Sequence, residues 1–451
     1  MAEDKRWDYW FSTETLTELF WKKIRYRCSP GLDRVGIVSF VNDLERNIEL
    51  INKKVLNGSY SFTKYCELLI SKGRNKSPRC VSRPTIRDKL VLCALHGYLQ
   101  ERYIKEVDNR LVHTKISEIV KKMPYYSHCI KIDMVRFYPS INHELLISQL
   151  SARISPCALK LVEKAITTPT VAKEYNSKLV ELKVPSVGVP EGLSISNLLA
   201  NIYLKDVDTY FHENPNTYYC RYVDDILILT NNQYIDWVKK EATAKIEGLK
   251  LTIHNFSETD KSYVVSCKEG FSYLGYYFCS ERVSIKPATL DRFEHSIERM
   301  FADFKKQENS QQKGQIHNVD MFAWKLNLKI AGCIYNSNKY GWMFYYSQIT
   351  DISLLNHLDW LIEQFYDRYK IEKSIIEKKS FFKTYHEIKY NLSHSSYFCN
   401  IDRMTKEEME NIIRDVFHYL VPVKKKNVEQ VFFNVLNANL KELERDVQFF
   451  S

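Results

Sequence analysis

Three aspartates stand at the ends of predicted strands. Residues Tyr219 to Leu229 read YCRYVDDILIL, so Asp224 and Asp225 interrupt two short aromatic or β-branched runs. Such runs predict the two strands of a hairpin with both aspartates at its turn. Upstream, the segment CIKID predicts another strand, which delivers Asp133 to its carboxyl end.

Carboxylates at the ends of neighbouring strands can share metal ions. Their hard oxygens suit Mg²⁺, which keeps several waters and takes one or two carboxylates together with substrate phosphates. Two such ions about 3.5 to 4 Å apart stabilise the attacking and leaving oxygens of an in-line phosphoryl transfer. An Asp-Asp turn also occurs in β-proteins that bind no metal, so the flanking segments must decide.

Basic residues crowd a segment before the first strand, SKGRNKSPRCVSR. Lys76, Arg79, Arg83 and Arg87 could clamp a triphosphate there, because guanidinium groups hold phosphate oxygens bidentately. A solvated basic loop explains the same residues equally well.

Two further segments could contact a nucleotide. Tyr138 follows Asp133 by five positions, which is close enough to wall a bound sugar. Gly188 to Leu204 reads GVPEGLSISNLLANIYL, in which glycines flank Glu191 and allow close backbone approach to a ligand. Ser196 then caps or opens an apolar helix.

The chain changes character after the aspartate hairpin. A helix near residues 235–249 leads to a loop with Lys261, which could reach a pyrophosphate leaving group, although a lone lysine is more often a surface residue. FSYLGYYF, from Phe271 to Phe278, predicts two strands around Gly275. From Pro287 onward the apolar residues recur at helical spacing.

Composition is consistent with a nucleic-acid partner. The 451 residues carry 65 Lys and Arg against 55 Asp and Glu, a net charge of +10, with 30 tyrosines and 23 phenylalanines. Basic surfaces with many stacking side chains suit nucleic acids. A mildly basic soluble enzyme fits the charge as well.

The eleven cysteines form no CxxC pair, which argues against a zinc site or a disulfide framework and indicates a reducing, cytoplasmic compartment. The charged N-terminus MAEDKRWDYW has no apolar signal region, and no run is long enough to span a membrane.

The order of these motifs over residues 57–280 resembles the palm of reverse transcriptases. The motif sequences are similar to those of group II intron and retron enzymes. This resemblance implies an α+β right-hand polymerase. Its domains would be N-terminal helices and fingers (1–120), a palm with an antiparallel sheet (121–282, with a fingers insertion at about 142–187), and an all-helical thumb and C-terminal RNA-binding region (283–451).

The resemblance also implies roles for individual residues. Asp133, Asp224, Asp225 and the carbonyl of Met134 would bind two Mg²⁺ ions, with Mn²⁺ as an alternative, and Lys261 would donate a proton to pyrophosphate. Tyr138 would be the steric gate against ribonucleotides. The remaining nucleotide contacts would be Lys76, Arg79, Arg83, Glu191 and Gly192, and Phe271 to Phe278 would form the primer grip.

Glu191 departs from the family pattern, which has glutamine after this proline. A carboxylate there repels a triphosphate unless an arginine pairs with it or it binds the sugar hydroxyl. The long tail, with LNLKIAGCIYNSNKYGWMFYYSQI, is similar to that of bacterial defence-associated reverse transcriptases. This implies antiphage defence, with a companion non-coding RNA copied from deoxynucleoside triphosphates into repetitive or homopolymeric DNA.

Three alternatives stay open. An RNA-binding scaffold could keep an idle palm, but buried like charges without a metal are costly. An abortive-infection type of enzyme could make DNA without a template or from a tyrosine primer. A mobile-element enzyme is disfavoured by the lack of recognisable maturase and endonuclease segments. The template, the primer and homo-oligomerisation cannot be read from the sequence.

Overall fold

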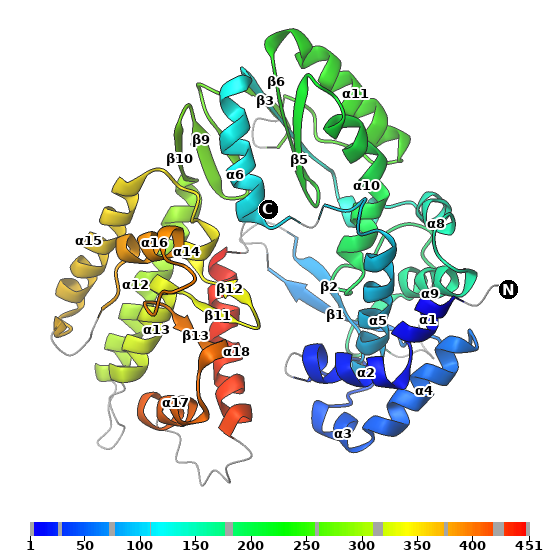
Figure 1. Ribbon diagram of the computed structural model, residues 1–451, viewed down its shortest axis with the longest axis horizontal. Coiled ribbons are helices and arrows are strands. Elements are labelled where there is room, and N and C mark those ends of the chain that lie inside the picture. Colours follow the sequence, from blue (N-terminus) through cyan, green and yellow to red (C-terminus); the bar gives the residue numbers. More distant parts are fainter. Residues whose placement is uncertain are drawn as a thin grey trace. The chain divides into compact units, whose positions relative to one another are not determined.

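The computed structural model describes residues 4–25, 29–71, 77–108, 110–175, 184–257, 261–309, 319–373, 378–417 and 428–447. Backbone contacts divide the chain into two compact units, Met1–Asn109 with His128–Val264 and Arg110–Ser127 with Val265–Ser451 (Figure 1). The limits proposed for fingers, palm and thumb stay a prediction.

The first unit combines helices with two sheets. Its α-helices are α1 (Lys5–Trp10), α2 (Thr13–Leu19), α3 (Ile37–Asn42), α4 (Leu44–Leu56), α5 (Ile86–Arg102), α7 (Phe137–Ser140), α8 (His143–Ser151), α9 (Pro156–Thr167), α10 (Ser196–His212) and α11 (Ile235–Gly248). Its strands are β1 (Tyr65–Ile70), β2 (Arg79–Arg83), β3 (His128–Asp133), β4 (Thr170–Val171), β5 (Thr217–Tyr222) and β6 (Asp225–Thr230), and β7 (Tyr263–Ser266) crosses the boundary to the second unit.

The larger sheet has the strand order β5-β6-β3-β7. Strand β6 is antiparallel to both β5 and β3. Its residues Ile226, Leu227, Ile228 and Leu229 are at most 1% exposed. Because successive side chains of a strand point to opposite faces, both faces of the sheet are covered at β6. Helix α10 packs on β5 and α11 on β3.

The smaller sheet of this unit has the order β2-β1-β4. Strands β1 and β2 are antiparallel, whereas β4 is parallel to β1. Arg79 and Arg83 stand at the two ends of β2, four positions apart, so their side chains leave the same face of the strand. The two arginine side chains therefore lie on the same face of the sheet but at opposite ends of β2.

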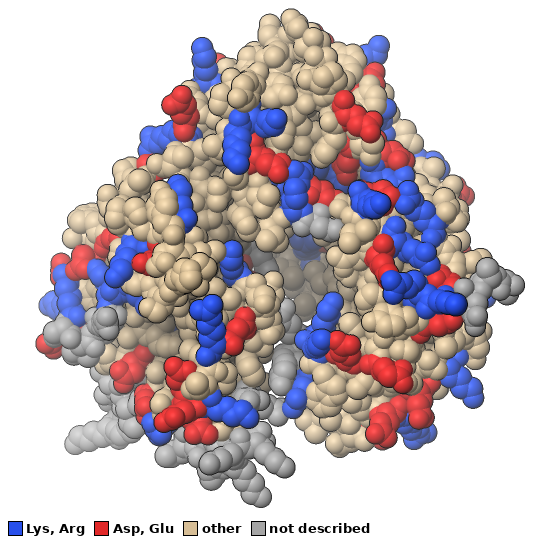
Figure 2. All heavy atoms as spheres, in the orientation of Figure 1, with Lys and Arg blue, Asp and Glu red and all other residues tan. Residues whose placement is uncertain are grey.

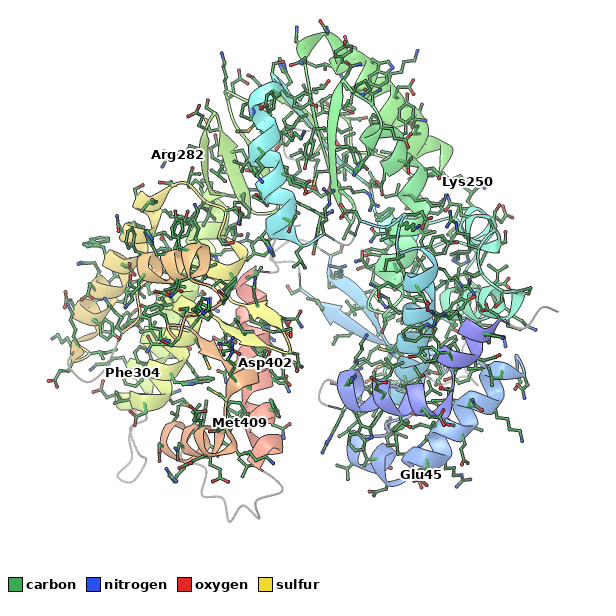
Figure 3. All side chains as sticks on the ribbon, in the orientation of Figure 1. Glu45, Lys250, Arg282, Phe304, Asp402 and Met409 are labelled. Atoms are coloured by element: carbon green, nitrogen blue, oxygen red, sulfur yellow. The ribbon has the colours of Figure 1, made fainter. Side chains whose placement is uncertain are left out.

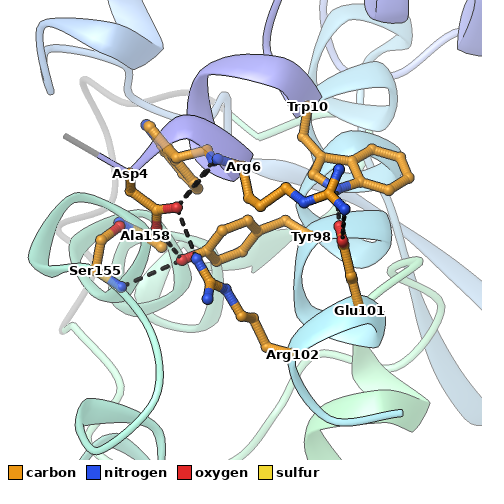
Figure 4. A network of polar contacts seen from close by, with 9 residues as sticks. Asp4, Arg6, Trp10, Tyr98, Glu101, Arg102, Ser155 and Ala158 are labelled. Atoms are coloured by element: carbon orange, nitrogen blue, oxygen red, sulfur yellow. Dashed lines mark hydrogen bonds and ion pairs between the residues drawn. The ribbon is translucent and has the colours of Figure 1, made fainter.

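A polar network fixes α1 to α5 (Figure 4). Asp4 Oδ2 accepts a hydrogen bond from the Tyr98 hydroxyl at 2.6 Å, and Asp4 Oδ1 accepts one from Arg102 Nη2 at 2.7 Å. Arg6 forms an ion pair with Glu101 at 2.8 Å. Asp4 and α1 are therefore attached to α5 by several polar contacts.

Gly97 in α5 leaves room for the ring of Trp10, because a Cβ at this position would lie 2.2 Å from the ring carbon Cζ3. We expect Gly97→Ala to destabilise the protein, since overpacking costs about 1–3 kcal/mol whereas alanine gains about 1 kcal/mol in helix propensity. Thermal unfolding measures this. Gly248→Ala is the matched control, because a Cβ there would point into open space beyond its own helix. Equal unfolding temperatures of the two variants would contradict the prediction.

The second unit is largely helical, as predicted. Its α-helices are α6 (Val112–Lys122), α12 (Pro287–Asn309), α13 (Val319–Ala331), α14 (Trp342–Tyr345), α15 (Ile352–Tyr369), α16 (Phe381–Tyr390), α17 (Lys406–Asn411) and α18 (Val428–Val447). Strands β8 (Phe271–Tyr273), β9 (Tyr276–Cys279) and β10 (Arg282–Ile285) form one small sheet, and β11 (Cys333–Tyr335), β12 (Asn338–Tyr340) and β13 (Cys399–Asn400) form another that the sequence did not predict.

Two aspartates fasten the strands of the second unit, and Figure 3 labels Asp402 and Arg282 at these places. The carboxylate of Asp402 accepts hydrogen bonds from the backbone N–H groups of Asn336 at 2.6 Å and Ser337 at 2.8 Å, in the turn between β11 and β12. Arg282 on β10 forms an ion pair with Asp351 at 2.7 Å, next to the start of α15.

Basic and acidic side chains are interspersed on the face drawn in Figure 2, so the net charge of +10 does not gather in one patch there. Among the helices of the described ranges, none is both long and apolar enough to cross a bilayer.

Candidate active site

The larger sheet positions the three aspartates. Asp133 is the last residue of β3 and Asp225 the first of β6, and the two are direct partners across the antiparallel pair. Asp224 precedes Asp225 in the turn after β5. The predicted strand ending at Asp133 and the predicted aspartate hairpin are both observed. Three carboxylates thus lie at one end of the sheet.

Backbone and side-chain hydrogen bonds from residues 254 and 262 also hold the backbone at Asp133. The Asp133 N–H donates to Ser262 Oγ at 3.1 Å, and the His254 N–H donates to the Asp133 carbonyl at 3.0 Å. Met134 forms a bridge with Ile253 and is 3% exposed. The assignment of the Met134 carbonyl as a metal ligand stays a prediction.

The turn that carries Asp224 is strained. Val223 has a φ of +59°, which is rare for a β-branched residue and indicates a conformation that its surroundings impose. Arg221 Nη1 donates to the Val223 carbonyl at 2.8 Å. Arg221 therefore helps to hold the turn in this conformation.

Arg221 is itself held by a buried network. Its Nε donates to Asp208 Oδ1 at 2.7 Å and its Nη1 to Asn201 Oδ1 at 3.0 Å, both on α10. The Tyr219 hydroxyl also donates to Asp208 Oδ1, at 2.8 Å. This network was not predicted from the sequence. A signal existed, because charged residues rarely stand inside otherwise apolar strands and helices without a partner.

Three nitrogen groups face the carboxylates. Lys131 Nζ lies 3.4 Å from Asp225 Oδ2, and Lys261 Nζ lies 3.3 Å from Asp133 Oδ2. His254 Nε2 lies 3.5 Å from the same Asp133 oxygen. The structure thus brings the predicted Lys261 to the aspartates and adds Lys131 and His254, which were not predicted.

The pKa values report how closely the negative charges are gathered. Burial raises the pKa of Asp225 to about 6; Lys131 opposes the shift, and the charges of Asp224 and Asp133 add to it. Burial also raises the pKa of Asp224, with a further contribution from Asp133 and an opposing one from Arg79. The carboxylates therefore repel one another, and a cation bound between them would reduce this repulsion.

The donor chemistry fits Mg²⁺, which favours a few carboxylate oxygens and leaves positions for water and phosphate. Within the described ranges, however, no three His, Cys, Asp or Glu side chains are gathered closely enough to hold a metal ion. A divalent cation would compete with Lys131 and Lys261 for the oxygens of Asp225 and Asp133.

The predicted nucleotide contacts divide into two groups. Arg79, Tyr138 and Glu191 lie within electrostatic reach of Asp224. Arg83, at the other end of β2, donates from Nη2 to Cys66 Sγ at 3.3 Å and is not brought to the aspartates by any contact observed in the described ranges. Lys76 lies outside the described residues.

Tyr138 lies in α7, next to residues 188–192, the loop with two glycines that we call the glycine loop. Its carbonyl accepts a hydrogen bond from the Val189 N–H at 2.9 Å. Burial raises the pKa of the Tyr138 phenol to about 12, and the negative charge of Asp224 contributes. The ring of Tyr138 is therefore uncharged and lies near Asp224, and its role as a gate against ribonucleotides stays a prediction.

The glycine loop approaches the protein's own backbone. Gly192 has a φ of +96°, and a Cβ there would lie 2.5 Å from Val81 Cγ1 and 3.0 Å from the Ser82 carbonyl of β2. Gly188 similarly approaches Pro139. The loop therefore joins β2 to α7, and the close approach to a ligand predicted for Gly192 stays a prediction.

Comparisons with known proteins identify the domain. Residues 70–278 match the family described as reverse transcriptase (RNA-dependent DNA polymerase). The chain is 23% identical over 306 residues to protein YkfC of Escherichia coli (strain K12), covering 56% of this chain and 77% of YkfC. It is 24% identical over 224 residues to the group II intron-encoded protein LtrA of Lactococcus lactis subsp. cremoris, covering 44% and 36% of the two chains.

A solved structure of apo telomerase from Candida tropicalis, truncated from its C-terminal domain, matches with a TM-score of 0.38 and 15% identity, over 50% of this chain and 55% of that one. The matched family segment contains all three aspartates together with Arg79, Tyr138 and Lys261. The predicted enzyme class and polymerase fold are confirmed: residues 70–278 form a reverse transcriptase domain, the catalytic domain of RNA-directed DNA polymerases.

Proposed function

We propose that this protein synthesises DNA on an RNA template by two-metal nucleotidyl transfer at Asp133, Asp224 and Asp225. The observation that carries the proposal is the pairing of Asp133 with Asp225 across β3 and β6, with Asp224 in the adjoining turn. Raised pKa values at Asp224 and Asp225 support it, since these carboxylates are costly to bury without a cation.

Each group has a role in this reaction. Bound Mg²⁺ would neutralise charge that develops on the phosphates during transfer. Asp133, Asp224 and Asp225 would hold the ions, and Tyr138 would exclude a 2′-hydroxyl. Lys261 would hold a proton for the departing pyrophosphate, because its ammonium group already lies 3.3 Å from Asp133.

We extend the proposal to biological context: the enzyme would copy a companion non-coding RNA into repetitive or homopolymeric DNA during antiphage defence. This part rests on the similarity of the C-terminal sequence to defence-associated reverse transcriptases. The helical second unit would hold structured RNA through its shape and phosphates.

Purification from cells that also carry the neighbouring native DNA tests this context. One structured RNA should co-purify with both the wild type and Asp224→Asn/Asp225→Asn. DNA that is complementary to this RNA, or that is homopolymeric, should co-purify with the wild type alone. DNA with no RNA counterpart would indicate untemplated or protein-primed synthesis. RNA without aspartate-dependent DNA would indicate an idle scaffold.

Tyr138→Ala should raise the incorporation of ribonucleotides relative to deoxynucleotides by about 10- to 100-fold, because removing the ring opens space worth about 1.4–2.8 kcal/mol of discrimination. Tyr138→Phe is the matched control, since it keeps the ring and removes only the hydroxyl. Primer extension with each nucleotide class gives the ratio. An unchanged ratio in Tyr138→Ala would place the gate elsewhere.

A further inference from the structure

Arg79, an arginine that acts electrostatically on Asp224, forms an ion pair with an acidic side chain. Glu191 Oε2 and Arg79 Nε form a direct ion pair. Both residues act electrostatically on Asp224 and on Tyr138. An arginine suited to phosphate is therefore already satisfied by a carboxylate from the same chain.

The backbone of Glu191 is fixed. Its carbonyl accepts a hydrogen bond from the Ser82 N–H of β2 at 2.7 Å. The neighbouring Gly192 packs against Val81 with no room for a Cβ, and the carbonyl of Pro190 accepts a hydrogen bond from Ser196 Oγ at 2.6 Å. The carboxylate is thus presented to Arg79 by a loop that is tied down on both sides.

Arg79 is the partner that can move. Its side chain is 44% exposed, whereas that of Glu191 is 19% exposed. Arg79 is also the first residue of β2, so only one side of it continues into the sheet. A ligand with more negative charge than one carboxylate could draw the guanidinium away while Glu191 stays in place.

We infer that Glu191 is a built-in competitor for Arg79, which an incoming nucleotide displaces with its phosphates. The inference rests on the proposed function for the identity of the ligand. Weakly charged anions gain too little from Arg79 to separate it from Glu191. Glu191 thereby makes the site selective for polyphosphates over singly phosphorylated ligands, at the expense of affinity.

Equilibrium binding of inorganic tripolyphosphate and orthophosphate to the full chain, followed by calorimetry, tests this without requiring DNA synthesis. Glu191→Gln should bind tripolyphosphate about fivefold more tightly than the wild type, the effect of losing a partly exposed competing ion pair. Its preference for tripolyphosphate over orthophosphate should fall. In an Arg79→Gln background, Glu191→Gln should change neither quantity.

Glu67→Gln is the matched control. Glu67 pairs with Ser82 across β1 and β2, so its side chain leaves the sheet on the face opposite Arg79. The substitution removes one negative charge, as Glu191→Gln does, from the sheet that carries Arg79. It should leave tripolyphosphate binding unchanged.

Several results would overturn the inference: equal binding by the wild type and Glu191→Gln, a gain that persists without Arg79, an equal gain in Glu67→Gln, or no tripolyphosphate binding by any of the proteins. The predicted binding pattern in a protein that makes no DNA would instead overturn the proposed function and leave the competition between Glu191 and phosphate standing.

Discussion

Asp224→Asn/Asp225→Asn should lose DNA synthesis by at least about a thousand-fold, equivalent to about 4 kcal/mol of transition-state stabilisation from correctly held metal ions. Asparagine has the shape of aspartate, so β6 and the strained turn at Val223 should be kept. The substitution removes two negative charges that burial and mutual repulsion already disfavour.

Primer extension with Mg²⁺ measures the loss, and circular dichroism reports whether the fold is retained. Asp236→Asn provides the control, because Asp236 is an exposed aspartate in the first turn of α11 in the same unit. The metal assignment would be wrong if the folded double variant kept more than about a tenth of wild-type synthesis. These carboxylates would then contribute less than about 1.4 kcal/mol of transition-state stabilisation.

Arg221→Ala should destabilise the protein by about 3–5 kcal/mol, since removing one member of a buried ion pair leaves an uncompensated charge. Arg221 is 7% exposed, and its loss deprives the Asp208 carboxylate of its guanidinium partner. It also removes the donor to the Val223 carbonyl. Synthesis by the fraction that remains folded should therefore fall as well, because Asp224 follows in that turn.

Urea unfolding monitored by circular dichroism tests this prediction. Arg368→Ala is the comparison, because Arg368 also pairs with a glutamate, at 2.6 Å, but its side chain is 61% exposed. Pairs of this kind contribute about 0–1 kcal/mol. A similar shift of the unfolding midpoint in both variants would show that the Arg221 network does not stabilise the turn.

The elements that carry the three candidate aspartates could be predicted from the sequence because their patterns are local. The run after Asp225 is continuously apolar, and β6 is buried on both faces. The segment ahead of Asp133 alternates strongly enough to define β3. The order of the motifs then suggested the palm over residues 57–280, close to the matched residues 70–278.

The interactions among these elements could not be predicted, because they join residues far apart in the chain. Arg79 and Glu191 are separated by 112 positions. The sequence showed that a carboxylate at Glu191 needs a partner such as an arginine but could not show which one. The contact between Lys131 and Asp225 could not be predicted for another reason. Lys131 lies within a strand, and whether it reaches Asp225 depends on the register of β3 and β6.

The sheet formed by β11, β12 and β13 was missed because tertiary contacts decide it. The apolar run from Phe322 predicts a helix as far as Ile334, but α13 ends at Ala331. Gly332 has a φ of +70°, and a Cβ there would lie 2.2 Å from the Tyr340 carbonyl. The turn that follows is held by Asp402, which lies 65 positions after Ser337.

Primer extension by the purified full chain on a defined RNA template, with sequencing of the product, tests the central claim most directly. We predict a DNA strand complementary to the RNA, formed from deoxynucleoside triphosphates, dependent on Mg²⁺ and absent when chelator is added. DNA whose sequence is independent of the template, or no incorporation by a folded wild-type protein supplied with Mg²⁺, would contradict the assignment of an RNA-directed DNA polymerase.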